Sequence, residues 1–310
     1  MRALITGISG FVGSHLAEYL SALGADIYGI ALNNCAPANT GVSCRGNILD
    51  GYFLRGLIAK VRPTHVFHCA GQLAGKTQPH ELFNVNVIGM YNVLAAVKNT
   101  RPRVIVAASS AVYGRRAAVP ISEDSPFNPM SEYSASKAAQ ELVAISQFHA
   151  HAIPVIRARI FNLLGPRQPE IFMASSLAKQ IVAVERGAAS TVRVHHLERR
   201  RDYVDVRDAV RACAILAECG EPGEAYNVCS GTSRSVRETL AGLMSQTQAT
   251  VTVEVDDFSD ASAAEDHRGS FVKLHGQTGW EPKISFEESL RDILNDWREK
   301  AIVVPKGRGN

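Results

Sequence analysis

The sequence lacks long hydrophobic runs and a strong net charge. No apolar stretch approaches the roughly 18 residues that a membrane span requires. The formal net charge is +3 over 310 residues, and the basic residues are scattered, so there is little to attract nucleic acid or an acidic membrane surface. We therefore expect neither a nucleic-acid partner nor a membrane partner.

Cysteine pairs are also missing. The six cysteines form no C-x-x-C pair and show no metal-ligand spacing with histidine, so we expect reduced thiols and no metal site. The first predicted strand begins almost at Met1, which leaves no room for a signal peptide. The sequence thus predicts a cytoplasmic location.

Apolar runs of strand length alternate with helix-like stretches through the first half of the chain. Runs this apolar are typical of strands buried on both faces, and the alternation predicts a parallel sheet with helices on each side. The expected fold is an α/β doubly wound Rossmann sheet with a smaller α/β C-terminal lobe. The predicted strands are Ala3–Ile5, Asp26–Leu32, His65–Cys69, Val104–Ala108 and Val155–Ile160.

The pattern loosens into shorter elements with proline and glycine from about Gly165 onward. We predict a dinucleotide-binding domain over 1–165, rejoined by part of 202–230, and a substrate-binding lobe over 166–201 and 231–310. A last helix is predicted after Ser285, which forms a capping box with Glu288. Its apolar face comprises Phe286, Leu290, Ile293, Leu294 and Trp297.

A glycine-rich turn, with G-x-x-G-x-x-G spacing, lies between the first strand and the first helix. Glycines there permit a tight turn and a close backbone approach, while the helix offers unpaired N–H groups to a pyrophosphate. The alternative is an ordinary tight turn, but the position favours dinucleotide binding. The predicted contacts are Gly7, Gly10, Phe11, Val12 and Gly13.

The end of the second strand carries Asn33 and Asn34. An acidic side chain at this place would accept hydrogen bonds from a ribose 2′-hydroxyl and repel a 2′-phosphate. The missing carboxylate favours NADP(H), although there is no adjacent arginine to bind the 2′-phosphate. NAD(H) stays an alternative.

A serine, a tyrosine and a lysine form the candidate catalytic set. Ser109 follows the fourth predicted strand, and Tyr133 and Lys137, four residues apart, share one face of a helix. A lysine ammonium ~4 Å from a tyrosine can lower the tyrosine pKa by about three units, which suits proton transfer at neutral pH. A chance Y-x-x-x-K on a solvated helix is the alternative for the pair alone.

Successive motifs of the chain resemble those of the extended short-chain dehydrogenase/reductases: Gly7–Gly13, Asn86–Gly89, Ser109–Gly114, Tyr133–Lys137 and Arg159–Asn162. The resemblance implies that the tyrosine is the acid/base, the lysine also holds the nicotinamide ribose, and the serine hydrogen-bonds the reacting oxygen. It further implies a homodimer through the tyrosine helix. Additional cofactor contacts are expected at Asn47, Ile48, Cys69, Ala70 and Gly71.

Within this family, four later stretches most resemble GDP-4-keto-6-deoxy-D-mannose reductases: Ser175–Ile181, Arg201–Asp208, Ala225–Gly231 and Thr278–Trp280. The resemblance implies hydride transfer to the C4 carbonyl of a nucleotide-linked 4-keto-6-deoxyhexose, which gives GDP-D-rhamnose. The expected substrate contacts are Gln72, Ser109, Asn162, Lys179 and Arg201.

Other activities of the same fold depend on particular residues. A 4,6-dehydratase needs a carboxylic acid and a carboxylate beside the serine, where Ser110 and Ala111 cannot titrate. A 4-epimerase with retained NAD uses the same three residues and stays open. A non-catalytic NADP(H)-sensing protein would not need all three. An R-P-S-E-like segment that contacts the nucleotide is not recognisable around Asp260 to Asp266, which leaves the base open.

Overall fold

The computed structural model describes residues 1–33, 41–73, 78–115, 118–256 and 266–303. Its centre is a seven-stranded sheet in the order β10-β6-β5-β4-β1-β2-β3, and every neighbouring pair is parallel. The predicted doubly wound fold is confirmed. The strands are β1 (Arg2–Thr6), β2 (Asp26–Ala31), β3 (Val42–Arg45), β4 (His65–His68), β5 (Arg103–Ser109), β6 (Val155–Ile160) and β10 (Ala225–Val228).

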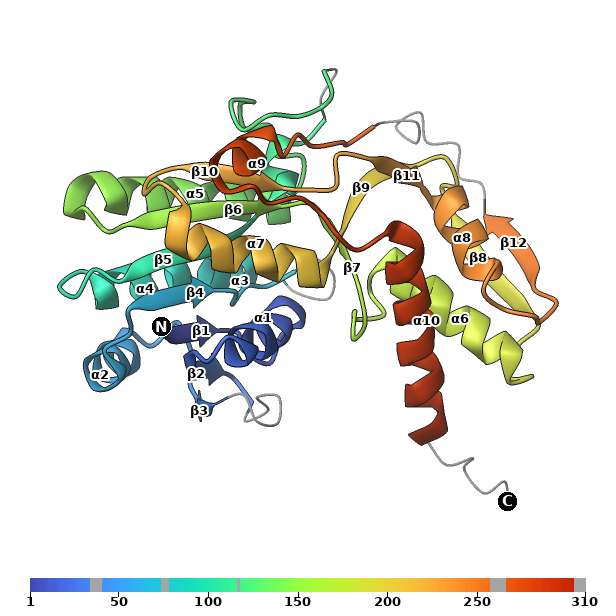
Figure 1. Cartoon of the computed structure of the whole chain (residues 1–310), viewed down its shortest axis with the longest axis horizontal. Coiled ribbons are helices and arrows are strands. Elements are labelled where there is room, and N and C mark those ends of the chain that lie inside the picture. The colour runs from blue at the N-terminus through green and yellow to red at the C-terminus, as the bar shows by residue number, and fades with distance from the viewer. Residues whose placement is uncertain (34–40, 74–77, 116–117, 257–265, 304–310) are drawn as a thin grey trace.

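Helices cover both faces of the sheet because successive strand side chains point to opposite sides. Ala3 and Ile5 of β1 pack with α1 (Phe11–Ala22) and α7 (Val206–Cys219), and α7 crosses in front of the strands in Figure 1. Leu4, between them, packs on the other face. The helices there are α2 (Gly51–Val61), α4 (Gly89–Val97) and α5 (Glu132–His151). Two short helices precede α4, namely α3 (Pro79–Phe83) and the π-helical η1 (Asn84–Ile88).

The C-terminal half adds a smaller lobe, on the right of Figure 1. Its core lies among α6 (Met173–Glu185), α8 (Val236–Met244), α10 (Phe286–Val303) and the parallel pair β8 (Thr191–His195) and β12 (Thr252–Asp256). A three-stranded sheet, β11-β9-β7, comprises β7 (Asn162–Leu164), β9 (Arg200–Asp205) and β11 (Ser233–Ser235). The remaining helix, α9 (Val272–Thr278), packs on the α7 side of the large sheet.

The last helix has the apolar face that the sequence predicted. Leu290, Ile293 and Leu294 are buried in the core of the lobe, and Phe286 and Trp297 pack against them. The Ser285 hydroxyl oxygen accepts a hydrogen bond from the Glu288 backbone N–H (3.1 Å), which satisfies one of the unpaired donors at the start of α10.

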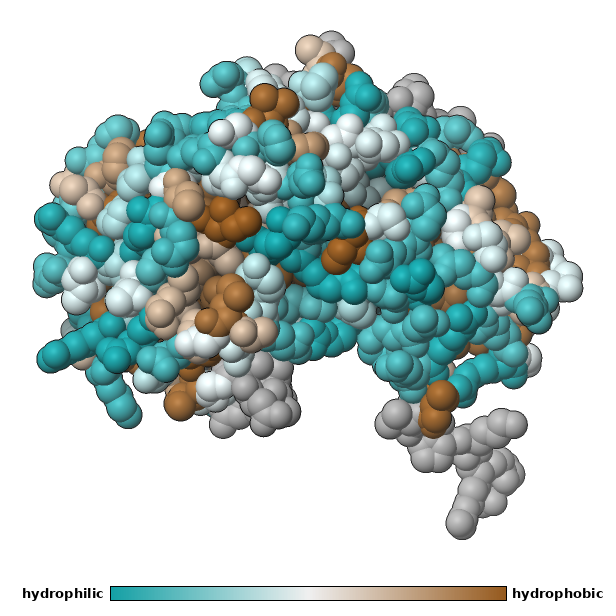
Figure 2. Space-filling model, in the orientation of Figure 1, coloured by the Kyte–Doolittle hydropathy of each residue, from teal (hydrophilic) through white to brown (hydrophobic). Residues whose placement is uncertain are grey.

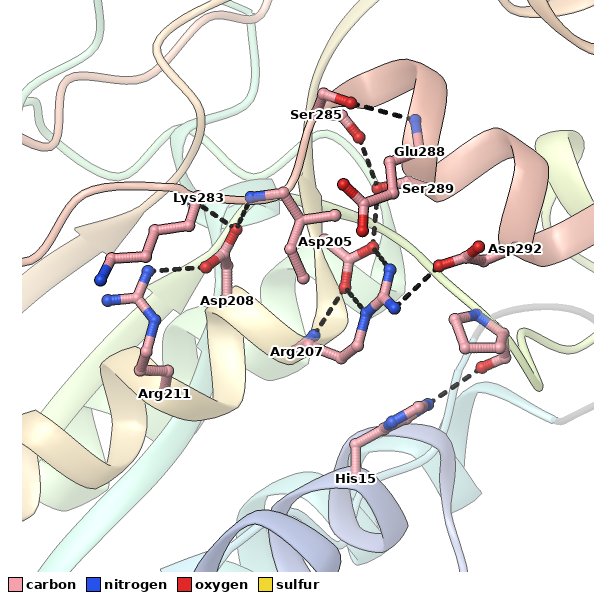
Figure 3. A network of polar contacts seen from close by, with 12 residues as sticks. His15, Asp205, Arg207, Asp208, Arg211, Lys283, Ser285, Glu288, Ser289 and Asp292 are labelled. Atoms are coloured by element: carbon pink, nitrogen blue, oxygen red, sulfur yellow. Dashed lines mark hydrogen bonds and ion pairs between the residues drawn. The ribbon is translucent and has the colours of Figure 1, made fainter.

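A network of charged side chains joins α7 to α10 (Figure 3). The buried Asp205 carboxylate accepts from the Arg207 backbone N–H (2.8 Å) at the start of α7 and from the Ser289 hydroxyl (2.6 Å) of α10. The Arg207 guanidinium then bridges Asp205 and Asp292 (both 2.8 Å). Because both elements meet on one buried carboxylate, the junction is held by directional contacts as well as by packing.

The surface carries few large apolar areas on the face drawn in Figure 2, where hydrophobic residues form small separate patches among hydrophilic ones. Such a mixture is normal for a surface in contact with water. In the part of the chain that the structure describes, no helix is long and apolar enough to cross a membrane.

Candidate active site

The glycine-rich turn connects β1 to α1 with almost no space around its backbone. Gly7 adopts a positive φ of 71°, and a side chain on Gly13 would place its Cβ 2.1 Å from the Gly7 carbonyl oxygen. Gly10 caps α1 without a side-chain hydrogen bond, and the first turn of α1 carries no acidic residue. The first N–H groups of α1 and its positive dipole end are therefore free of side-chain competition, and this cradle fits the pyrophosphate of a dinucleotide. Phe11 and Val12 are half-buried against the core behind the turn.

The segment after β4 lies beside this turn because β1 and β4 are neighbours in the sheet. The Ala70 backbone N–H donates to the Thr6 hydroxyl oxygen (3.2 Å), and a Cβ on Gly7 would lie 2.8 Å from the Ala70 N and Cα atoms. Cys69 and Ala70 are half-buried, and Gly71 is exposed. These three predicted cofactor contacts thus line the carboxyl end of the sheet, where such folds bind their ligands.

The predicted contacts on the adenine side are split between surface and core. Asn33 and Asn47 are exposed, whereas Ile48 is buried. The Asn47 side chain accepts from the Leu49 backbone N–H (2.9 Å), so it stabilises the turn before α2. Asn34 lies outside the described residues.

Ser109, Tyr133 and Lys137 come together at the carboxyl end of β5. Ser109 is the last residue of β5, and Tyr133 and Lys137 lie on the first turns of α5. The Ser109 side chain lies close enough to the Tyr133 phenol to lower its pKa. The Lys137 ammonium, which is buried, donates to the Ala107 carbonyl (2.7 Å) of β5. The sheet and one helix thereby place a hydroxyl, a phenol and an ammonium in one small volume.

Local contacts determine where α5 begins and how it faces the sheet. A capping box joins the Ser131 hydroxyl oxygen to the Ser134 backbone N–H (3.2 Å) and the Ser134 hydroxyl oxygen to the Ser131 N–H (2.8 Å). The buried Asn86 side chain in η1 donates to the Ser136 hydroxyl (2.9 Å) and accepts from the Gln72 backbone N–H (2.7 Å). One amide therefore ties α5 to the segment after β4.

Burial governs the ionisation of the candidate catalytic groups. It raises the pKa of Tyr133, and the nearby Ser109 side chain lowers it only in part. Burial also lowers the pKa of Lys137 to about 8, while the charge of Glu141 acts in the opposite direction. The sequence-based expectation that Lys137 lowers the pKa of Tyr133 is therefore wrong for this structure, because the low-dielectric surroundings penalise the phenolate. A phenol that stays protonated at neutral pH is suited to donate a proton.

The predicted substrate residues lie in different surroundings. Gln72 is half-buried next to Asn86, and Asn162 is exposed on β7 opposite Tyr203 of β9. Arg201 on the same strand is half-buried and donates to the Arg200 carbonyl (2.6 Å). Lys179 on α6 is instead exposed, ion-paired with Glu170, with Nζ 5.5 Å from the Trp297 ring centroid. The structure joins Gln72 to the catalytic helix through Asn86, and it holds Lys179 in a surface ion pair.

His267 is a neighbour of the site that the sequence reasoning missed. Its ring hydrogen-bonds the backbone of Ser110 and of Gly114, and its centroid lies 5.4 Å from that of Phe161. Burial, followed by the charge of Arg201, lowers the pKa of His267 to about 4. His267 therefore lies beside the segment after Ser109. A single histidine more than a hundred residues beyond the tyrosine carries no local motif, so only the tertiary structure reveals it. Of the segment Asp260 to Asp266, where a nucleotide contact was sought in the sequence, residues 260–265 lie outside the described chain.

A buried ion-pair cluster links α5 to β6 of the large sheet. The Glu141 carboxylate, fully buried, accepts from Arg157 (3.0 Å) and pairs with Arg159 (2.9 Å), both on β6. Arg159 also donates to the Tyr113 hydroxyl oxygen (2.9 Å), which donates to Asn227 (2.7 Å) on β10. These contacts fix the catalytic helix to the sheet.

The parallel sheet, the glycine-rich turn and the Ser109–Tyr133–Lys137 set together define an extended short-chain dehydrogenase/reductase. The model of the family described as GDP-mannose 4,6 dehydratase matches residues 4–293. The chain belongs to this family of nucleotide-sugar enzymes.

Three relatives illustrate the range of the family. The chain is 34% identical to a GDP-6-deoxy-D-mannose reductase of Pseudomonas aeruginosa, covering 96% of this chain and 98% of that protein. It is 27% identical to a UDP-glucose 4-epimerase of Mycolicibacterium smegmatis, covering 97% and 100%. Among solved structures, RMD from Pseudomonas aeruginosa complexed with NADPH superposes with a TM-score of 0.86 at 32% identity, covering 97% and 100%. A nicotinamide dinucleotide is the cofactor class that these findings support, since other solved relatives carry NAD.

Proposed function

We propose that this protein reduces the C4 carbonyl of a nucleotide-linked 4-keto-6-deoxyhexose with NAD(P)H, and that its substrate is GDP-4-keto-6-deoxy-D-mannose, which yields GDP-D-rhamnose. The observation that carries the proposal is the convergence of Ser109, Tyr133 and the buried Lys137 at the carboxyl end of β5. The similarity over nearly the full length to a GDP-6-deoxy-D-mannose reductase supports the choice of substrate.

Each catalytic side chain has a separate task in this proposal. The cofactor, when bound, supplies a hydride to the carbonyl carbon. Tyr133 donates a proton to the oxygen as negative charge develops on it, and the raised pKa of Tyr133 keeps that proton available at neutral pH. Ser109 donates a hydrogen bond to the same oxygen. The Lys137 ammonium adds positive charge close to the reacting groups and contacts the cofactor ribose.

The cofactor would lie along the carboxyl end of the sheet, within the domain of residues 1–165 and part of 202–230. We assign its contacts to the glycine-rich turn, to Asn33, Asn47 and Ile48, to the segment 69–71, and to Tyr133 and Lys137. NADP(H) is favoured because Asn33 is exposed and presents no carboxylate to a 2′-phosphate. The NADPH complex of the Pseudomonas aeruginosa relative supports this preference.

The substrate would lie between that domain and the lobe of residues 166–201 and 231–310. Gln72, Ser109 and Asn162 are proposed to contact the sugar, and Lys179 and Arg201 the diphosphate. Lys179 must leave Glu170 to do so, which an exposed ion pair permits at little energetic cost.

A symmetric dimer through α5 is also proposed, and the cytoplasmic location stays a prediction. Leu142 on α5 is 57% exposed, and Ile88 and Tyr91 on the adjoining η1 and α4 are each 48% exposed. A second copy of the chain would cover these apolar side chains. A monomeric mass in light scattering would contradict the dimer.

The decisive experiment supplies GDP-4-keto-6-deoxymannose, generated in situ, with NADPH or NADH. We expect stoichiometric loss of reduced-nicotinamide absorbance with formation of the 4-hydroxy sugar, and its loss in Tyr133→Phe. Absence of oxidation with GDP-, dTDP-, CDP- and UDP-linked 4-keto sugars would refute the reductase. Retained NAD with sugar epimerisation would then identify a 4-epimerase, and cellular function that survives Tyr133→Phe would identify a cofactor sensor.

A further inference from the structure

The Lys137 ammonium has a second hydrogen-bond partner besides the Ala107 carbonyl. Its Nζ donates to the side-chain oxygen Oε1 of Gln140, one helical turn further along α5, over 2.5 Å. An ammonium has three N–H groups. Within the described ranges these two acceptors are the hydrogen-bond partners of Nζ. One N–H is therefore left for a ligand.

Gln140 is an unusual choice for its position. The side chain is completely buried, and its Nε2 has no hydrogen-bond partner among the described residues. An unpaired buried N–H group destabilises a fold, and an apolar side chain of the same size would avoid that loss. Turning the amide over would point its N–H groups at the ammonium. Among the residues that the structure describes, the favourable polar contact of this amide is thus the one with Lys137.

A neutral acceptor affects the ammonium differently from a carboxylate. Gln140 stabilises the charged form through its dipole but adds no counter-charge, so the positive charge stays available to other groups. The neighbouring carboxylate, Glu141, is committed to Arg157 and Arg159. The Glu141 carboxylate is thus paired with two arginines, whereas the Lys137 ammonium is hydrogen-bonded to two neutral acceptors, an amide and a carbonyl.

We propose that Gln140 is a positioning residue that keeps the Lys137 ammonium charged and directs its remaining N–H toward the reaction site. The catalytic meaning of this role rests on the proposed reductase function, whereas the contact itself does not.

Among the described residues, the other titratable groups around Lys137 are neutral or already paired, and none replaces Gln140 as a hydrogen-bond acceptor for the ammonium. On β4, burial lowers the pKa of His68 to about 3 and raises the pKa of the Cys69 thiol, so both are neutral near pH 7. On α5, Tyr133 is protonated and Glu141 is shared with the two arginines. Burial already lowers the pKa of Lys137 to about 8. Because the Gln140 side-chain oxygen accepts a hydrogen bond from the ammonium and stabilises its charged form, loss of this acceptor should lower the Lys137 pKa further.

Two variants shift the charge of Lys137 in opposite directions. Gln140→Met removes the acceptor at similar volume, and Gln140→Glu replaces it with a counter-charge. Gln168→Met is the matched control, because Gln168 is also buried, has an unpaired Oε1, and donates to the Leu163 carbonyl (2.5 Å) away from the lysine. The titration is followed by the 13Cε chemical shift in protein labelled at lysine, assigned with Lys137→Met.

We expect a Lys137 midpoint near pH 8 in the parent protein and in Gln168→Met. The midpoint should move about one unit lower in Gln140→Met, which is a tenfold change in the protonation equilibrium, and higher in Gln140→Glu. An unchanged midpoint in Gln140→Met overturns the proposal, and that result decides it even if Gln140→Glu does not fold.

Two further measurements distinguish positioning from packing. In Gln140→Met the high-pH limb of kcat/KM should move to lower pH. NADPH should bind about fivefold more weakly at pH 8, because the protonated fraction of Lys137 falls from about a half to about a tenth. The Tm of Gln140→Met should stay equal or rise, because the unpaired Nε2 is gone. A lowered Tm with unchanged NADPH affinity would show a packing role only and overturn the proposal. If the parent protein oxidises no NADPH with any 4-keto sugar, the proposed function fails, but the lysine titration still decides the role of Gln140.

Discussion

Replacing Gly13 by alanine is expected to separate α1 from the turn that begins the cofactor site. The added Cβ would lie 2.1 Å from the Gly7 carbonyl oxygen, 2.8 Å from the Gly7 carbonyl carbon and 2.9 Å from the Ile8 Cα. All three are backbone atoms, and the Gly7 N–H is itself bound to the Ile30 carbonyl of β2 (2.8 Å). Because this hydrogen bond holds the turn against β2, the start of α1 must move to relieve the close contacts.

The size of the effect follows from these contacts. Overpacking of a close-packed interior costs typically 1–3 kcal/mol, and contacts with rigid backbone place this case at the upper end, about 3 kcal/mol. For a chain of 310 residues that corresponds to a Tm about 5 °C lower, from an unfolding entropy of about 2.1 cal/mol/K per residue. Displacement of the helix N–H groups should weaken NADPH binding at least about tenfold, or 1.4 kcal/mol.

The assay compares two identical substitutions at different glycines. Gly56 lies exposed in α2 with no atom within 4 Å of an added Cβ, so Gly56→Ala should raise stability by about 0.5–1 kcal/mol through helix propensity. Thermal unfolding and NADPH fluorescence titration are measured for both variants. Parent-like NADPH affinity and Tm in Gly13→Ala would refute the reasoning, since the close contact would then not constrain the turn.

Three other perturbations test different parts of the site. Glu141→Ala leaves Arg157 and Arg159 buried without a counter-charge and should cost about 3–5 kcal/mol in urea unfolding; a loss below 1 kcal/mol would contradict the importance of the cluster. Since burial lowers the pKa of His68 to about 3, the unfolded chain binds a proton below pH 6.5 that the folded chain excludes. Stability is thus lost as pH falls from 6.5 toward 3, by on the order of 5 kcal/mol, and His68→Gln should show a flatter pH profile than the parent protein. Asn33→Asp should shift the ratio of NADPH to NADH turnover toward NADH by tenfold or more, because a carboxylate repels the 2′-phosphate; an unchanged ratio would place the adenosine ribose elsewhere.

Sequence reasoning succeeded where local pattern and tertiary role coincide. The five predicted strands are apolar because both of their faces are buried, and all five lie in the parallel sheet. Strand β3 escaped prediction because its four residues at the sheet edge, half-buried or exposed, show no such run. The glycine-rich turn and the Tyr133–Lys137 spacing could be recognised in the sequence because each involves residues within a few positions of one another.

Ionisation of the site could not be predicted in the same way. A spacing of four residues places Lys137 near Tyr133, but the pKa of the tyrosine depends on how much water the surrounding elements exclude. Burial raises the pKa of Tyr133, so the direction of the predicted shift was wrong. The ion pair of Lys179 with Glu170 on the surface could likewise not be predicted from the sequence, and the substrate contact of Lys179 stays a prediction.

The amino-acid sequence by itself determined the order of the five predicted strands, the glycine-rich turn and the three candidate catalytic side chains. These features depend on periodicity and on residue types within a few positions of one another. The tertiary structure alone decided that His267 approaches the segment after Ser109, that Glu141 meets two arginines of β6, and that Gln140 binds the lysine. Such contacts arise from the packing of separate elements, and side-chain burial, which governs their charge, is a property of the whole fold.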